Sequence, residues 1–405
     1  MADNKDKKVL NVPALRFPEF TDEWKEVLFA SNLERLENGA TYNTNDKDGV
    51  PMSRIETIST GRIDYTKVGH CSTPQKIEHY IMRYGDILFS HINSLKHIGK
   101  TAYYSAEEPL YHGMNLLLFR CKNNVDSKFF FFLINNTHFI RKCQILAKQA
   151  VNQASISTSD LKKIKVYIPD INEQSKIQKF LSLIEKRIEL QNKIIEKYES
   201  LIQAIIYKAK MDGISKGTWR RIDLCKVLQE RNEKNVDGRT ICSVSVSQGV
   251  VNQIEYLGRS FAAKQTSHYN IVKYGDIVYT KSPTGDFPYG IIKRSDIRED
   301  VAVSPLYGVY IPASDIVGVI LHFYFMQPSN AFNYLHPLIQ KGAKNTINIT
   351  NGRFLENSVP LPISKSEANT IAGILKTIQA KIEIEKNLLQ SYTKEKEYLL
   401  RQMFI

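Results

Sequence analysis

The feature that most limits what this chain can fold into is an internal repeat. Residues 83–90 read RYGDILFS and residues 273–280 read KYGDIVYT. AVNQASISTSDLKKIKVYIP at 150–169 matches AKNTINITNGRFLENSVPLP at 343–362, and EQSKIQKFLSLIEKRIE at 173–189 matches EANTIAGILKTIQAKIE at 367–383. Weaker matches lie upstream, at Trp24 and Trp219 and at Gly61 and Gly249, so the sequence predicts that the whole chain is two copies of one unit of about 200 residues.

Each copy ends in a segment whose apolar residues alternate steps of four and three, which predicts a long helix with a heptad stripe. Asp170, followed by Glu173 in a capping-box arrangement, marks the start of the first helix, and Asp212–Gly213 marks its end. Polar residues break both stripes at equivalent places, Gln191 and Glu385. This favours pairing of the two helices, although packing of each on its own globular domain stays open. The predicted pairing residues are Ile177, Leu181, Ile184, Ile188, Ile195, Tyr198, Ile202, Ile371, Leu375, Ile378, Ile382, Leu389 and Tyr392.

Chain connectivity then suggests an arrangement. The first helix would deliver the chain through a linker at Gly213–Gly217 into the second copy, and the second helix would run back antiparallel to it, giving internal pseudo-twofold symmetry. We expect a globular domain at 1–169, a spacer helix at 170–212, a second globular domain at 213–362 and a second spacer helix at 363–405.

The globular segments mix strand-like and helical stretches. Strands are expected at 86–90, 115–120 and 301–311, and helices at 127–147 and 314–327. The predicted fold class is therefore α+β.

Charge and composition narrow the function. The chain has 55 Lys and Arg against 42 Asp and Glu, a net charge of +13 spread over all four segments. This favours a polyanionic partner, with scattered solubilising lysines as the alternative. The longest apolar run, Phe129–Ile134, is too short to span a membrane. The N-terminus lacks a signal-peptide pattern, and the five cysteines lack metal-binding spacing, so we expect a cytoplasmic protein without structural zinc.

The repeated Tyr-Gly-Asp predicts a turn before a buried strand, rather than a catalytic role for Asp86 or Asp276. The copies diverge directly after this strand, into HINSLKHIGKT and KSPTGDFPYGI. Asn, Gln, Lys, Ser and Thr are the side chains that read bases or hold phosphates, although ordinary solvated loops remain an alternative. The candidate DNA contacts are His91, Asn93, Ser94, Lys96, His97, Lys100, Gln149, Asn152, Gln153 and Ser155, then Lys281, Ser282, Thr284, Lys344, Asn345, Thr346 and Asn348.

A Trp opening, a Gly-Asp-Ile strand, a polar loop before IKVYIPDINEQSKI, and a helix with Glu-Gln-x-x-Ile, nearly all present twice, resemble the DNA-specificity subunit of type I restriction-modification enzymes. The resemblance implies two target-recognition domains that read a bipartite, asymmetric sequence of double-stranded DNA, whose gap the helices set. It also implies two methyltransferase subunits bound to the chain, and restriction subunits in the larger complex. The second copy departs from the pattern at the start of its helix, with Glu367-Ala368 in place of Glu-Gln.

Motifs for catalysis are missing from the sequence. It has no Asn/Asp-Pro-Pro-aromatic run, no Gly-x-Gly-x-x-Gly and no Gly-x-x-x-x-Gly-Lys-Ser/Thr. We therefore expect a non-catalytic chain that binds no cofactor or metal, with S-adenosylmethionine, ATP and Mg²⁺ on its partner subunits. The main alternative is a non-catalytic coiled-coil adaptor that binds acidic proteins.

Overall fold

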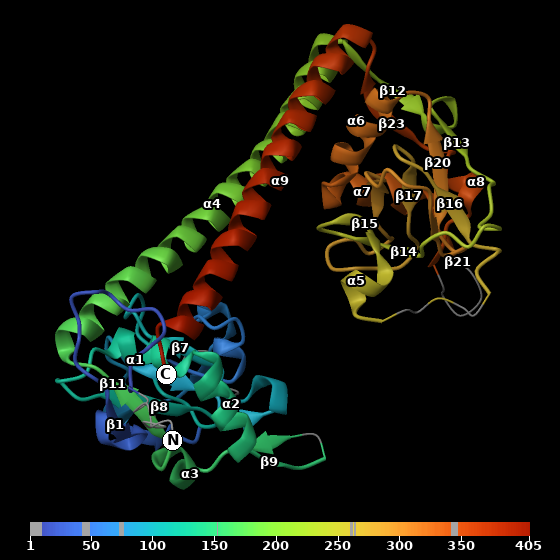
Figure 1. The fold of residues 1–405 in the computed structure, drawn as a ribbon. Helices are drawn as coiled ribbons and strands as arrows, with labels where there is room; N and C mark the ends of the chain where they lie inside the picture. The colour runs from blue at the N-terminus through green and yellow to red at the C-terminus, as the bar shows by residue number, and fades with distance from the viewer. Residues whose placement is uncertain are drawn as a thin grey trace, which may run out of the picture. The chain divides into compact units, whose positions relative to one another are not determined.

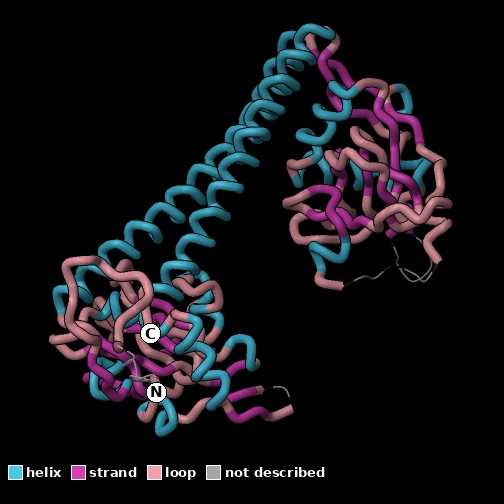
Figure 2. The backbone as a smooth tube through the Cα atoms, in the orientation of Figure 1, coloured by secondary structure: helices cyan, strands magenta, loops and turns pink. Residues whose placement is uncertain are grey.

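The computed structural model describes residues 10–42, 49–72, 77–151, 153–259, 262, 265–341 and 347–405. Contacts divide the chain into two compact units, Met1–Gln191 with Leu388–Ile405, and Asn192–Asn387. Each unit contains a mixed globular domain, and two long helices, α4 (Ile171–Lys216) and α9 (Lys365–Gln402), contribute to both (Figures 1 and 2). The predicted α+β class with two long helices is confirmed.

The first globular domain is built around an antiparallel sheet of order β2-β8-β5-β7. The predicted helix at 127–147 is two helices, because the side chain of Asn136 accepts a hydrogen bond from Phe139 N (2.8 Å) and starts a new one. The strands are β1 (Lys25–Leu28), β2 (Leu33–Asn38), β3 (Val50–Met52), β4 (Gly69–Cys71), β5 (Ile87–Phe89), β6 (Ile92–Asn93), β7 (Thr101–Tyr103), β8 (Leu117–Cys121), β9 (Lys148–Gln149), β10 (Ala154–Ser155) and β11 (Lys165–Ile168), and the helices are α1 (Ser127–Ile134), α2 (Thr137–Leu146) and α3 (Thr158–Lys162).

The core of this domain includes residues from both ends of the chain. The apolar run Phe129–Ile134 in α1 is entirely buried, and the ring of Trp24 lies 6.2 Å from that of Phe404. The backbone N of Leu15 donates to the carbonyl of Gln402 at 2.9 Å. The C-terminal end of α9 and the residues after it are therefore part of the first unit.

The second globular domain repeats this plan. Its sheet β13-β20-β17-β18 has the same order of equivalent strands, and the predicted strand at 301–311 is two strands, β19 and β20. The strands are β12 (Trp219–Asp223), β13 (Leu228–Glu230), β14 (Cys242–Ser245), β15 (Gly249–Asn252), β16 (Asn270–Val272), β17 (Ile277–Tyr279), β18 (Ile292–Arg294), β19 (Val301–Val303), β20 (Gly308–Pro312), β21 (Gln340–Lys341), β22 (Ile347–Asn348) and β23 (Ser358–Pro362), and the helices are α5 (Gln253–Leu257), α6 (Asp315–Phe325), α7 (Pro328–Leu335) and α8 (Asn351–Phe354).

The repeated Tyr-Gly-Asp forms the same turn in both domains. It precedes an inner strand of each sheet, β5 in the first and β17 in the second, which we call the central strand. Gly85 and Gly275 both have a φ of 91°, a conformation that side chains with a Cβ rarely adopt. Asp86 and Asp276 each accept a hydrogen bond from the backbone N–H three residues earlier, at 2.7 and 2.8 Å. Both aspartates are buried, at 1% and 2% exposure, so the prediction of a structural turn is confirmed.

The first long helix begins as predicted, since Asp170 Oδ1 accepts from the backbone N of Asn172 (2.8 Å) and of Glu173 (3.3 Å). The fully buried Glu173 carboxylate accepts two hydrogen bonds from Arg16, both at 2.7 Å. Glu173 therefore ties the start of α4 to the N-terminal segment. The equivalent Glu367 of α9 accepts a hydrogen bond from Trp219 Nε1 at 2.8 Å.

The end of α4 corrects the predicted stop at Asp212–Gly213, because the helix runs on to Lys216. Gly213 serves packing instead: a Cβ at this position would lie 1.9 Å from Trp219 Cδ1. The chain leaves the helix at Gly217, which has a φ of 71°. The predicted linker at 213–217 is therefore mostly helical.

The helices run antiparallel within each unit. In the first unit Glu185 pairs with Lys396 at 2.7 Å, and Arg187 lies 5.3 Å from the ring of Tyr392. In the second unit Glu199 pairs with Lys386 at 3.5 Å. All thirteen predicted stripe residues are buried or half-buried, but Ile177, Leu181 and Ile184 also belong to the core of the first globular domain. The beginning of the first stripe thus packs on its own domain as well as on α9.

Candidate nucleic-acid interface

In the first domain, the two polar segments predicted to contact DNA meet in one small sheet. Strand β10 lies between β6 and β9, with Ala154 opposite both Asn93 and Gln149. Segments about 60 residues apart in the sequence thereby share a surface. Ala154 and Ile156 are buried, while Gln153 and Ser155 alternate with them and are exposed. The alternation turns one face of this strand toward solvent.

The loop after β5 is held in a defined shape by its own polar groups. Asn93 Oδ1 accepts from the backbone N of Ser94 at 2.8 Å, and Ser94 Oγ lies 3.0 Å from His97 Nδ1. Lys100 Nζ donates to the carbonyl of Ser59 at 2.8 Å. Ser94 and Lys96 are exposed, whereas Asn93, His97 and Lys100 are half-buried. These five side chains all reach the surface next to the small sheet.

His91 is a correction to the predicted set. Its side chain is only 7% exposed, and burial lowers its pKa to about 4, so the imidazole is neutral at physiological pH. The residue lies at the end of the central strand, where its carbonyl accepts a hydrogen bond from Ile156 N at 2.9 Å. With so little of its surface exposed, the His91 imidazole is not available to a DNA groove in this structure.

The tip between β9 and β10 is a tight turn closed by hydrogen bonds between the backbones of Ala150 and Gln153. Val151 at this tip is 99% exposed and Gln149 is exposed beside it. Asn152, which was also predicted as a DNA contact, lies outside the described residues.

Sequence reasoning missed the basic side chains that flank this sheet. Arg141 and Lys142 are exposed on α2, and Lys148 is exposed in β9, directly after the helix ends (Figure 1 labels both elements). Their signal was present in the segment THFIRKCQIL, where the buried positions Phe139 and Cys143 leave Arg141 on the opposite face of the helix and Lys142 beside the buried stripe.

The second domain presents a different surface after its central strand. Ser282 and Thr284 are exposed, and Thr284 and Phe287 exchange two backbone hydrogen bonds of 3.0 Å that close a turn. Lys281 is half-buried, and burial lowers its pKa. This loop is shaped differently from the loop after β5.

Of the remaining predicted residues of this domain, the structure describes Asn348. Asn348 lies in β22 opposite Gln340. Lys344, Asn345 and Thr346 lie outside the described residues. Among the described residues the hairpin β21–β22 forms a two-stranded sheet, whereas its counterpart β9–β10 has β6 as a third strand.

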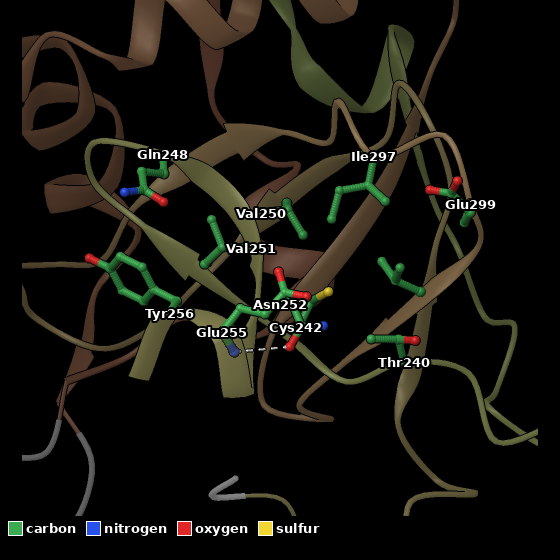
Figure 3. A pocket seen from close by; sticks show the side chains of 11 residues that line it. Thr240, Cys242, Gln248, Val250, Val251, Asn252, Glu255, Tyr256, Ile297 and Glu299 are labelled. Atoms are coloured by element: carbon green, nitrogen blue, oxygen red, sulfur yellow. Dashed lines mark hydrogen bonds between the residues drawn. The ribbon is translucent and has the colours of Figure 1, made fainter. Parts of the chain in front are cut away.

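A cavity of about 830 Å³ opens beside the hairpin β14–β15 (Figure 3). Its walls combine apolar side chains, such as Val250 and Ile297, with Asn252, Glu255 and Glu299. Predicted DNA contacts are not among the residues that line it, and its two carboxylates would repel phosphate.

Within the residues that the structure describes, no cluster of three or more His, Cys, Asp or Glu side chains is placed to hold a metal ion. Nor does any described helix have the length and apolar character needed to cross a membrane.

Comparison with known proteins identifies the family. Residues 22–200 match the type I restriction modification DNA specificity domain. A protein of Methanocaldococcus jannaschii assigned as the specificity subunit of the type I restriction enzyme MjaX is 31% identical over 409 residues, covering 94% of this chain and 93% of that protein. The chain belongs to the type I restriction enzyme specificity subunits.

The resemblance seen in the sequence is thus confirmed for this specificity subunit. The matched residues 22–200 include β6, β9 and β10, the strands that carry the polar surface of the first domain. In fold, the specificity subunit is similar to the crystal structure of the type I restriction-modification S subunit from M. genitalium. That likeness has a TM-score of 0.58 at 15% identity and covers 97% of this chain and 99% of that one.

Proposed function

We propose that this specificity subunit binds double-stranded DNA at a bipartite, asymmetric sequence, with one half-site read by each globular domain. The observation that carries the proposal is that the two domains share one fold but differ in their surface loops. Both domains have the same sheet order and the same Tyr-Gly-Asp turn, yet the loops after β5 and β17 differ in sequence and in shape. Two readers of different half-sites need this combination.

The chemistry of the first surface suits a DNA groove. Asn93, Gln149 and Ser155 offer hydrogen-bonding groups on adjacent strands, and Asn or Gln can bond bidentately to adenine. Lys96 and Lys148 beside them are exposed cations that can hold phosphates. The net charge of +13 adds the general attraction to a polyanion.

We further propose that the chain recruits two methyltransferase subunits, and restriction subunits in the larger complex, and that those partners bind S-adenosylmethionine, ATP and Mg²⁺. Large apolar side chains on the outer faces of the helices support recruitment of protein. Leu183 (65% exposed) and Leu190 (49%) lie on α4, and Ile384 (64%) lies on α9. Single exposed apolar residues are common on protein surfaces, so the support comes from the spacing: Leu183 and Leu190 are seven residues apart and therefore share one face of α4.

The test is the methylated sequence in cells that express this chain with its methyltransferase subunit. We expect two short specified half-sites separated by unspecified bases. A chimera that carries residues 1–169 of another specificity subunit should change one half-site and keep the other. A single continuous motif would contradict the bipartite proposal. The adaptor alternative predicts that the purified chain binds acidic proteins and no duplex DNA, which a mobility-shift assay with and without the methyltransferase would show.

A further inference from the structure

The repeated Tyr-Gly-Asp motif contains one residue, the tyrosine, that the turn does not require. The left-handed conformation explains the glycine of Tyr-Gly-Asp, and the buried hydrogen bonds explain the aspartate. The tyrosines, in contrast, point outward: Tyr84 is 72% exposed and Tyr274 is 52% exposed. A large aromatic side chain stands on the surface at the same place in both domains.

The two tyrosines also have equivalent neighbours. The ring of Tyr84 meets the ring of Tyr103 edge-on at 5.9 Å, and the ring of Tyr274 lies 4.5 Å from the guanidinium carbon of Arg294. Tyr103 and Arg294 occupy the same position in the two sheets, since each pairs with the first residue of the central strand. The position is therefore duplicated in three dimensions as well as in sequence.

In the first unit, side-chain contacts connect this position to a long helix. Lys128 Nζ lies 4.6 Å from the ring of Tyr103 and forms an ion pair with Glu185 of α4 at 2.8 Å. Lys396 of α9 pairs with the same glutamate. Tyr84 therefore stands beside the contacts through which the domain meets its helices.

The second unit makes the equivalent connection with different residues. Arg294 Nη2 donates to Asp315 Oδ1 at 2.5 Å, and Asp315 also pairs with Lys376 of α9. Tyr274 is thus placed beside the helix of its own unit, as Tyr84 is in the first.

The proposed DNA loops lie at the other end of the central strand. The tyrosine comes just before β5 or β17, and the polar loop follows the strand. Each strand has three residues and spans about 10 Å. The loop after the strand differs between the domains, which fits a different DNA half-site for each. The tyrosine position before the strand is the same in both domains, which fits one partner that binds twice.

We propose that Tyr84 and Tyr274 are equivalent contacts for two copies of one protein, the methyltransferase subunit. This inference rests on the proposed function, which supplies a partner that binds twice. Tyrosine suits the role because its ring offers rigid apolar area and its hydroxyl a hydrogen bond, and tyrosine is among the residues that contribute most to binding at protein interfaces.

The experiment compares Tyr84→Ala, Tyr274→Ala and the double variant in the full chain, with the methyltransferase subunit as the probe. Native mass spectrometry counts the copies bound, and titration gives their affinities. Each single variant should weaken one of two copies at least about tenfold, and the double variant should weaken both. Tyr256→Ala is the matched control, because Tyr256 is 45% exposed and lies on α5, away from the duplicated position.

The outcomes separate this inference from the proposed function. If the wild-type chain binds two copies and the double variant binds them equally well, the tyrosine contact is overturned and recruitment stands. Should the wild-type chain bind no methyltransferase, both proposals fail together. If Tyr84→Ala weakens duplex binding by the chain alone, the residue belongs to the DNA surface and the protein contact is overturned. Unchanged duplex binding with a lost copy supports the inference.

Discussion

Arg120 donates two hydrogen bonds to the carboxylate of Asp86, from Nε at 2.8 Å and from Nη2 at 2.7 Å. In the second domain Arg231 does the same for Asp276, at 2.7 and 2.9 Å. The two arginines come from different places, because Arg120 lies in β8 while Arg231 follows β13, the counterpart of β2. The repeat therefore preserves a buried ion pair without preserving the position of its cation.

Replacing Asp86 by Ala should destabilise the first domain strongly. Arg120 would remain with a side chain only 9% exposed and without its counter-charge, which costs about 3–5 kcal/mol in similar buried pairs. Hydrogen–deuterium exchange should show lost protection in β5 and β8 and unchanged protection in β17 and β20. Glu26→Ala, which breaks the exposed pair with Lys165, is the control and should change little. Wild-type protection of β5 in the Asp86 variant would contradict a stabilising role for the ion pair between Asp86 and Arg120.

Two helix glycines should respond to alanine in opposite directions. Gly213→Ala places a Cβ against the ring of Trp219 and should destabilise the second unit by about 1–3 kcal/mol through overpacking. Gly373→Ala in α9 meets no atom within 4 Å and should stabilise it by about 1 kcal/mol, because alanine is the better helix former. Urea unfolding measures both, and a loss of stability in both variants would show that the close approach to Trp219 is not the cause.

Replacing Asn93 and Lys96 by Ala should weaken or relax one half of the target. Asn93 is the last residue of β6 and Lys96 lies three residues further on, both in the first domain, and a lost bidentate base contact costs about 1–3 kcal/mol. Methylated-motif mapping with the variant should show tolerance at one half-site only. Equal loss at both halves, or none, would argue against this loop as a reading element.

Duplex binding should fall steeply as salt rises. With about six to ten phosphate contacts, affinity should drop by about 10³ to 10⁵ between about 50 and 200 mM salt, because bound cations are released from the DNA. Fluorescence anisotropy of a labelled duplex at several salt concentrations measures the slope. A flat response would be incompatible with the electrostatic account of a chain whose charge is +13.

We expect helix length to set the gap between half-sites. Four residues inserted after Gln191 in α4, with four inserted after Glu385 in α9, add about 6 Å to each helix and turn it some 40° beyond a full turn. Against about 3.4 Å per base pair, the unspecified gap should widen by one or two base pairs while the half-sites stay the same. The added rotation will reduce activity. Motif mapping that finds the old gap, or new half-site bases, rules out a spacer role for the helices.

The helices were predictable and the loops were not, for a physical reason. A heptad stripe is a local pattern, so the burial of residues such as Leu181 and Leu375 can be predicted from their spacing in the sequence. The joining of β6 to β10 depends on contacts between distant segments, which no local pattern reveals. His91 was predicted as a groove contact because a polar residue type does not indicate how deeply its side chain is buried. Gly213 looked like a helix stop, since the approach of Trp219 is a tertiary contact.

The core that joins Trp24 to Phe404 has a consequence for the order of events during synthesis. The second unit is one continuous stretch, Asn192–Asn387, and has all its residues once that stretch has left the ribosome. The first unit emerges earlier but lacks Leu399, Leu400, Met403 and Phe404, which are buried against its own core. Its apolar surface therefore stays uncovered until residues 399–404 have been translated. The unit that is translated first is thus completed only after the second unit has been translated.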